Sequence, residues 1–227
     1  MKNVIILFFL FIFLISACNP EDLISEFGTA VITAKSKVGE VLNTAMTDFA
    51  DDAKLAAIYG LNVDSKGQVD LQRPTENAFV YIVQSDSVSI ANPSEANQFY
   101  VPVYKLTPVR SPLNFNTMAS FIKDAQAKNI MELVFGELST IHIDPSASYD
   151  DSPEVLNLMF SRNDVTTFRT ANPGAKTDMY LIPSKSIDTT SVSNTVDWIV
   201  NFYGDSTSLV LWLHPGNVNG TIDVLSD

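Results

Sequence analysis

The spacing of hydrophobic residues predicts an amphipathic helix near the start of this chain of 227 residues. Between residues 21 and 60, apolar side chains recur at alternating intervals of three and four, which is the period of a helix with one apolar face. The aspartates between Asp48 and Asp52 predict a break, and a second helix is expected from Asp51 to Tyr59, ending at Gly60. The residues of the first stripe are Ile24, Phe27, Val31, Ala34, Val38, Val41 and Ala45.

Strand-like segments follow this helical region. Residues 61–70 are typical of a hairpin around a tight turn at Asp64–Gly67, because aspartate, serine and glycine favour turns. Strands are expected at Ala78–Gln84 and at Phe99–Leu106, since both segments are rich in aromatic and β-branched residues. Pro102 indicates that the second of these strands is an edge strand or carries a bulge.

The second half of the chain is predicted to begin with a helix and to continue with strands. The helix is expected from Asn116 to Phe135, with Gly136 at its end. Gly204-Asp205 lies between two apolar runs and predicts a hairpin over residues 197–214. The strands expected after the helix are 139–143, 155–161, 166–170, 179–183, 197–203, 208–214 and 221–225.

This order of elements predicts an α+β fold, with antiparallel sheet meanders and packed helices. One globular domain is expected over residues 49–227, with two possible helix-plus-meander units at 49–112 and 113–227. Residues 18–48 are expected to form a helical tether in front of it. The tether has two alternative forms, a helix docked on its own domain or a coiled-coil stalk. Two glycines within it weaken a long helix and favour docking.

The start of the chain has the pattern of an export signal. A basic residue, Lys2, precedes an unbroken apolar run from Val4 to Ile15, and the small residues Ser16-Ala17 follow. A transmembrane helix is one alternative, but spanning a bilayer takes about 20 apolar residues. A plain secretory signal with a chance cysteine is the other. Cys18 argues against it, because the sole cysteine of an exported chain needs a role other than an internal disulfide.

The segment Ile15-Ser16-Ala17-Cys18 resembles the lipobox of bacterial lipoproteins. The resemblance implies cleavage before Cys18, a diacylglycerol on its thiol and an acylated new N-terminus, and several acyl chains together give stable anchoring. Asn19, not aspartate, follows the cysteine, which in enterobacterial lipoproteins indicates the outer membrane. Glu21 and Asp22 resemble the surface-export signals of some Bacteroidetes lipoproteins. The resemblance therefore implies a cell-envelope protein attached to a membrane through lipid on Cys18.

The composition agrees with an exported globular domain. Apolar residues make up 46% of the chain, which is enough to fill a core, and the net charge is −12. An acidic surface of this kind repels nucleic acid and anionic lipid headgroups. Nucleic acid is therefore not expected as a partner, and the membrane is expected as one only through the lipid on Cys18.

Residues 50–106 resemble PepSY-like and other cystatin-like exported modules. The resemblance rests on a helix leading into Asn62-Val63-Asp64 and Gly67, then the aromatic strand Phe79–Val83, then a second strand. The strand start of such modules often carries tryptophan, where this chain has phenylalanine. The resemblance implies a fold more than an activity, because one fold can host many functions.

The loop between residues 144 and 154 is the main candidate for cation binding. Four carboxylates within eleven residues offer several oxygen ligands, which Ca²⁺ prefers. The alternative is a solvated loop in which aspartate and serine side chains cap turns and lead into the next strand. The candidate ligands are Asp144, Asp150, Asp151 and Glu154.

Two histidines, His142 and His214, are the other candidates for chemistry. The sequence has no His-Glu-x-x-His helix, no Gly-x-Ser-x-Gly elbow and no Gly-rich phosphate loop. On a strand, His142 and Asp144 would share a face and Ser139 would point to the other, which disfavours a local catalytic triad. No catalytic residue, resident metal or cofactor is therefore expected.

Tyr100 and Tyr104 are expected on one face of the predicted edge strand, where they would form a small recognition surface. The leading hypothesis is a membrane-anchored, non-catalytic binding or interaction module whose ligand the sequence does not identify. One alternative is a structural or assembly subunit of an envelope complex. The other is a hydrolase whose catalytic residues lie far apart in the sequence.

Overall fold

The computed structural model describes most of the chain between residues 31 and 225. It divides the chain into two compact units, Met1–Val31 and Ile32–Asp227. The fold and the candidate site lie in the second unit. The described ranges are 31–72, 77–91, 98–104, 112–114, 142–186, 190–191 and 194–225.

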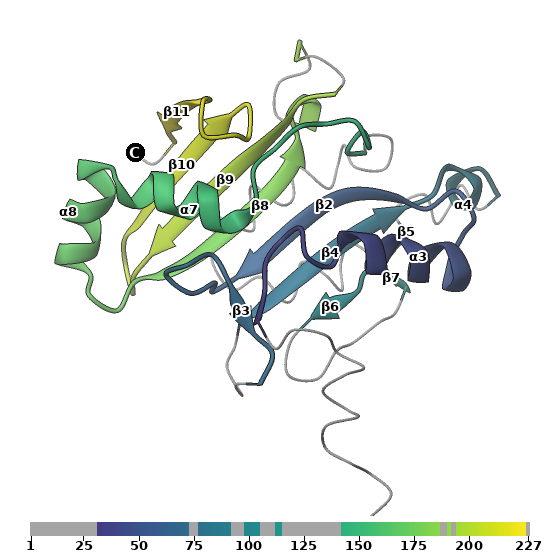
Figure 1. Cartoon of the computed structure of the whole chain (residues 1–227), viewed down its shortest axis with the longest axis horizontal. Helices are drawn as coiled ribbons and strands as arrows, with labels where there is room; N and C mark the ends of the chain where they lie inside the picture. The colour runs from purple at the N-terminus through teal and green to yellow at the C-terminus, as the bar shows by residue number, and fades with distance from the viewer. Residues whose placement is uncertain are drawn as a thin grey trace, which may run out of the picture. The chain divides into compact units, whose positions relative to one another are not determined.

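A large antiparallel sheet forms the centre of the second unit (Figure 1). Its strands among the described residues are β2 (Lys54–Leu61), β4 (Ala78–Gln84), β5 (Gln98–Tyr100), β6 (Val103–Tyr104), β7 (Pro112–Asn114), β8 (Lys176–Pro183), β9 (Val196–Tyr203), β10 (Ser208–His214) and β11 (Thr221–Val224). They are ordered β11-β10-β9-β8-β2-β4-β5-β7, and β6 pairs with β4. Two short strands, β1 (Val31–Ile32) and β3 (Val69–Asp70), pair separately. This antiparallel sheet with packed helices confirms the α+β class predicted from the sequence.

Helices cover one face of this sheet (Figure 1). They are α3 (Val38–Asp48), α7 (Ser152–Phe160) and α8 (Asn163–Ala171), and a short helix, α4 (Asp86–Ala91), follows β4. Val41 and Ala45 of α3, and Val155 and Met159 of α7, are fully buried in the main hydrophobic cluster. Their spacing of four places each pair on one side of its helix, so each helix presents an apolar stripe to the sheet.

The opposite face of the sheet has a hydrophobic cluster of its own. The buried carboxylates Asp178 and Asp197 share this face, because they alternate along β8 and β9 with side chains of the helix-covered face. Both of these buried carboxylates therefore lie on the side of the sheet opposite the helices. The apolar members of the second cluster are Ala56, Ala57, Tyr59, Ile82, Val101, Tyr180, Ile182, Ile199 and Val210.

The helix expected over residues 51–59 is wrong, because this segment forms the central strand β2. All six interior residues of β2 are buried, and a short apolar run of this length is equally compatible with a buried strand. Pairing with β4 and β8 on both sides outweighs the helix propensity of its alanines. Gly60 does not end a helix. A Cβ there would lie 2.8 Å from Val63 Cγ1, so glycine permits close packing.

Two expected strands, 155–161 and 166–170, are also wrong, because α7 and α8 occupy these positions. Asp151 caps α7 by accepting a hydrogen bond from the backbone N–H of Ser152, and Pro153 lies in the first turn. Both are signals of a helix start. The buried Val155, Leu156 and Met159 follow a helical spacing and not the alternation of a strand.

The other strand predictions within the described residues are largely confirmed. β4, β8, β9, β10 and β11 lie at the expected segments, and β9 and β10 form the expected hairpin, with Tyr203 opposite Ser208. The expected strand 99–106 is interrupted by Val101–Pro102, and the Pro102 carbonyl accepts from the N–H of Tyr81. Its two pieces, β5 and β6, both pair with β4.

The expected turn at Asp64–Gly67 is confirmed, but the hairpin around it is wrong. The N–H of Gly67 donates to the Asp64 carbonyl over 3.0 Å, and the Asp64 carboxylate accepts from the N–H groups of Lys66 and Gln68. However, β3 pairs with β1 and not with β2. Gly67 has a φ of +69°, in the left-handed region that favours glycine.

Several expectations fall on residues that the structure does not describe. The helix expected at 116–135 and the signal and lipidation segment, including Cys18, lie outside the described residues. The strand expected at 139–143 is described only at its last two residues, which belong to no strand or helix. Across the expected boundary between units 49–112 and 113–227, β2 pairs with β8, so strands of both segments share one sheet.

Candidate functional site

The candidate site is built around Asp197, a fully buried carboxylate near the start of β9. One of its oxygens, Oδ1, accepts hydrogen bonds from the Ser184 hydroxyl at 2.6 Å and pairs with His214 Nδ1 at 2.7 Å. The other, Oδ2, accepts from Trp212 Nε1 at 2.9 Å. This carboxylate of β9 thus contacts both the 3₁₀ turn after β8 and the end of β10.

Strand geometry explains why these side chains meet. Trp212 and His214 are two residues apart on β10 and therefore share a face, and the register pairs Trp212 with Ile199 of β9. Asp197 lies two residues before Ile199 on the same face, next to His214. Ser184 directly follows β8, where the backbone of Pro183 pairs with Val196. The antiparallel register of β8, β9 and β10 therefore sets the cluster.

The pairing with Asp197 orients the imidazole of His214. The ring nitrogen Nδ1 faces Asp197 Oδ1, and Nε2 is the other nitrogen of the ring. The His214 side chain is 37% exposed, whereas Asp197 is fully buried. This arrangement can hold an imidazole for proton transfer. The Ser184 hydroxyl donates to Asp197 and not to the imidazole, so these three residues do not form the hydrogen-bond chain of a catalytic triad.

A second buried carboxylate, Asp178, accepts hydrogen bonds from neighbouring strands at the other end of the same sheet face. Its Oδ2 accepts from the Tyr59 hydroxyl at 3.1 Å, and its Oδ1 accepts from the Tyr203 hydroxyl at 3.3 Å and from the N–H of Asn62 at 2.8 Å. Burial, followed by the charge of Asp178, raises the pKa of Tyr59 far above its ordinary range. The Tyr59 ring stacks on Tyr180 with centroids 4.8 Å apart. Tyr59 is therefore a fixed neutral donor.

The four candidate calcium ligands serve other roles. Asp151 Oδ1 accepts from the N–H groups of Ser152 and Lys35, and its Oδ2 from the Thr33 hydroxyl at 2.6 Å. Asp150 Oδ2 accepts from the N–H of Val218. Asp151 therefore caps α7 and joins it to the segment before α3.

Asp144 and Glu154 are the remaining two candidate calcium ligands. Asp144 accepts from the backbone and hydroxyl of Ser146, which lowers the pKa of Asp144, and Glu154 lies in the first turn of α7. Within the described ranges, no three histidine, cysteine or carboxylate side chains gather closely enough to hold a metal ion. The structure thus does not bring the four together, and the alternative of aspartates and serines that cap turns describes the loop better. The loop leads into a helix, where a strand was expected.

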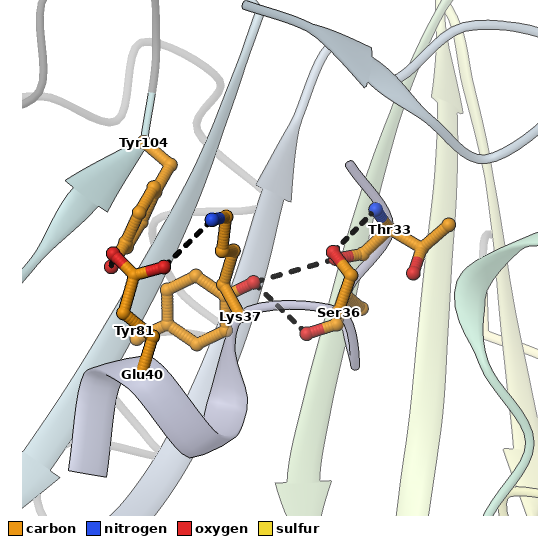
Figure 2. Close-up of polar contacts among 7 residues, drawn as sticks. Thr33, Ser36, Lys37, Glu40, Tyr81 and Tyr104 are labelled. Carbon is orange, nitrogen blue, oxygen red and sulfur yellow. Dashed lines mark hydrogen bonds and ion pairs between the residues drawn. The ribbon is translucent and has the colours of Figure 1, made fainter. Parts of the chain in front are cut away.

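The recognition surface expected at Tyr100 and Tyr104 is wrong, because both side chains are only 3% exposed. Figure 2 shows the Tyr104 hydroxyl directed at the Glu40 carboxylate of α3, to which it donates over 2.8 Å. Lys37 forms an ion pair with the same carboxylate. The ring of Tyr104 packs edge-on against that of Tyr81, with centroids 5.6 Å apart. Tyr104 therefore binds α3 to the sheet.

The same close-up shows how the segment before α3 is attached. The Tyr81 hydroxyl of β4 donates to the Ala34 carbonyl over 3.0 Å, and the Ser36 hydroxyl donates to the Thr33 carbonyl over 2.8 Å (Figure 2). Tyr100 is equally engaged, since it stacks on Phe49 at 5.8 Å. The strands that carry Tyr100 and Tyr104, β5 and β6, are covered by α3 and the residues on either side of it. The alternation of residues in the sequence does not predict this cover.

His142, the other histidine, lies beside the start of β2. The N–H of Ile143 donates to the Leu55 carbonyl over 2.8 Å and places this segment there. Burial, then the nearby positive charge of Lys54, lower the pKa of His142. Lys54 itself pairs with Asp86 at 2.6 Å. Burial and the charge of Lys54 therefore favour the neutral form of His142, which lies next to the Lys54–Asp86 ion pair.

Asp52 connects the start of β2 to the start of α4. Its carboxylate accepts from the hydroxyl groups of Ser85 and Ser87 and from the N–H of Ser87. The Ser85 hydrogen bond is the main cause that lowers the pKa of Asp52 to about 2. This carboxylate therefore stabilises the fold at any pH above its ordinary pKa.

Asp52→Asn is expected to lower the free energy of unfolding by about 1 kcal/mol at neutral pH, because it weakens hydrogen bonds at a helix start. A lowered pKa in the folded state means that the native chain binds protons less readily than the unfolded chain. The difference between wild type and variant should therefore disappear as the pH falls from about 4 to about 2. Urea unfolding at pH 7, 4 and 2 measures it, and an unchanged difference at pH 2 would contradict this assignment.

Comparisons of this chain with protein-family models, with curated proteins and with solved structures found no match. None of the helices in the described part of the chain has both the length and the apolar character needed to cross a bilayer. The function must therefore be argued from the residues themselves.

The sequence marks His214 as a candidate but does not predict the cluster around Asp197. The signal was present in the run Val196–Phe202, where Asp197 and Asn201 interrupt an otherwise apolar strand. A carboxylate at a buried strand position requires hydrogen-bond partners. The indole N–H of Trp212 and the imidazole of His214, two residues apart on β10, supply them.

Proposed function

We propose that this protein is an exported cell-envelope lipoprotein, anchored through lipid on Cys18, whose α+β domain is a binding or interaction module. The observation that carries the proposal is the apolar run that ends in Ile15-Ser16-Ala17-Cys18, which contains the only cysteine of the chain. Asn19 at the next position favours the outer membrane. Residues 18–48 then form the tether in its docked form, which the burial of Val41 and Ala45 of α3 supports. The possible division of residues 49–227 into two units remains part of the proposal.

The order of the described domain supports a binding role. Asp178 and Asp197 are the buried carboxylates of the sheet, and each accepts hydrogen bonds from several neighbouring strands or turns. A buried polar group that is fully bonded in this way fixes one arrangement of its surroundings. The domain is thereby a preorganised scaffold, which favours binding because little order has to be gained.

Intact-mass analysis of the membrane-extracted protein tests the anchor. We expect a mature chain that begins at Cys18 and carries a diacylglycerol and an acyl group. In Cys18→Ala the lipid mass should be lost and the chain should leave the membrane fraction. Cys18→Ser is the matched control, because it keeps the size and polarity of the side chain without the thiol. An unmodified wild-type chain would refute the anchor and the localisation together.

Two alternatives have different support. A stalk or assembly role would need residues 24–46 to self-associate, yet Val41 and Ala45 of α3 are buried in the core of their own domain. A hydrolase is favoured by one observation, the imidazole of His214 held by buried Asp197. That alternative requires turnover of a nitrophenyl ester above the buffer rate, with His214→Gln returning the rate to background.

A further inference from the structure

In the part of the chain that the structure describes, strand β11 forms one end of the nine-stranded sheet, and most of its side chains are exposed. Among the described residues β11 pairs with β10 alone (Figure 1). In this pair Val224 lies opposite Leu211, and Thr221 lies opposite His214. Thr221, Asp223 and Val224 are exposed, and Ile222 is half-buried. At the other end of the order, β7 begins with Pro112, which has no N–H to offer. The two ends of the sheet therefore differ in what they offer a further strand.

The register fixes which backbone groups of β11 point outward. The N–H of Leu225 donates to the Val210 carbonyl over 2.8 Å, so the positions that bond to β10 are Leu225 and every second residue before it. Ile222 and Val224 lie between these positions. Their N–H and C=O groups therefore point away from β10, and an extended polypeptide has the spacing to bond to both of them.

The side chains around this edge are apolar, with one carboxylate. Val218, Val224 and Leu225 are each at least 45% exposed, and they are three of the five exposed large hydrophobic residues in the described part of the chain. Asp223 lies between Ile222 and Val224 but points to the opposite face, the face that carries Trp212. Lysine and proline, with which exposed edges are commonly protected, do not occur in β11.

We propose that β11 binds an extended peptide strand that carries a basic side chain opposite Asp223 and apolar side chains on either side of it. In antiparallel pairing, the residue opposite Asp223 occupies a site without direct backbone bonds, where side chains approach most closely. Its neighbours exchange backbone hydrogen bonds with Ile222 and Val224. This inference rests on the proposed function, because it names the ligand class of the binding module.

Charge favours such a peptide over a second copy of this chain. Two copies paired symmetrically about Asp223 would bring the two carboxylates directly opposite each other, which is destabilising. A net charge of −12 also opposes self-association and attracts basic segments. The occupant that fits the outward groups, the apolar side chains and the charge is therefore a basic, apolar strand from a different polypeptide.

The probe is a capped, fluorescein-labelled pentapeptide of sequence threonine-valine-lysine-valine-threonine, mixed with the full chain in detergent. Fluorescence anisotropy measures its binding, and amide hydrogen exchange locates the site. In the free protein, the N–H groups of Ile222 and Val224 should exchange quickly and that of Leu225 slowly. Saturation with the peptide should slow exchange at Ile222 and Val224 by about tenfold or more, because each gains a strand hydrogen bond.

Two substitutions at Val224 distinguish backbone pairing from nonspecific hydrophobic adsorption, and a third, at Asp223, tests the charge. Val224→Pro removes one outward N–H without touching a bond to β10, and should weaken peptide binding by about tenfold. Val224→Thr keeps the N–H and a β-branched shape, and should bind nearly as well as wild type. Asp223→Lys should weaken binding of the lysine peptide and improve binding of the same peptide with glutamate in place of lysine. Thermal unfolding of each variant confirms that the fold is intact.

Each outcome decides the inference. Peptide binding with protection at Ile222 and Val224, loss in Val224→Pro and the charge exchange with Asp223→Lys would support it. Absence of binding, or protection elsewhere, would overturn it. Sedimentation without peptide that finds a dimer lost in Val224→Pro would assign the edge to a second copy and also overturn it. The mass of the Cys18 species reports on the proposed function independently, so the two can fail separately.

Discussion

Asp197→Ala is expected to lower the free energy of unfolding by about 2–4 kcal/mol, because it removes one acceptor from three donors at once. Ser184 is fully buried and would lose its partner outright, and Trp212 Nε1 would be left facing an apolar sheet surface. The half-exposed His214 can turn to water, which keeps the cost below that of a fully buried network. Urea unfolding at neutral pH, followed by circular dichroism, measures the change.

Ser184→Ala is the matched control for this network. It removes a single donor and leaves Asp197 with its bonds to Trp212 and His214, so we expect a loss of about 1 kcal/mol. Equal losses for the two variants would mean that Trp212 and His214 contribute nothing through Asp197. If Asp197→Ala lowers the free energy of unfolding by less than about 1 kcal/mol, this carboxylate does not stabilise the contact of β9 with β10 and with the turn after β8.

Trp198→Ala is expected to cost about 3–5 kcal/mol, the range typical of deleting a large aromatic side chain from a core. Trp198 is fully buried on the helix-covered face, and its Nε1 donates to the Asp150 carbonyl over 3.0 Å. The substitution would leave a cavity in the main cluster and an unpaired carbonyl in the loop before α7. Thermal and urea unfolding, followed by far-ultraviolet circular dichroism, measure the loss.

Trp198→Phe keeps an aromatic ring at this position but loses the indole N–H and some volume. We expect a loss of about 1–2 kcal/mol for this control. A similar loss for alanine and phenylalanine would assign the contribution of Trp198 to its hydrogen bond with Asp150. A small loss for both would show that the main cluster does not depend on this residue.

The sequence predicted strands well where a turn separates two apolar runs. Gly204-Asp205 located the hairpin of β9 and β10, because its strands pair with each other and depend on no distant segment. A helix is predicted over β2 because Asp51 and Asp52 suit a first helical turn, alanines follow them, and Gly60 can end a helix. The strand form of β2 results from pairing with β4 and β8, one close in sequence and the other distant.

The errors at α7 and at the tyrosines have different causes. Asp151-Ser152-Pro153 is a sequence signal of a helix start. The apolar run that follows it is also compatible with a strand, which is the structure predicted from the sequence. Pro102 is typical of an edge strand and therefore predicts that Tyr100 and Tyr104 are exposed. Their burial depends on α3, whose docking position no local pattern contains. The Asp197 site likewise depends on the register of three strands, although its residues are visible in the sequence.

The pairing of β2 with β8 has a consequence for the order of folding. Ile58 lies opposite Leu181, so the centre of the sheet is closed by a contact between segments very far apart in the chain. Contacts of such long range carry a large loop-closure cost and slow folding. Until β8 arrives, the apolar strand β2 has one unsatisfied edge, which invites aggregation. A chain that has not yet paired β2 with β8 therefore depends on protection of the open edge of β2.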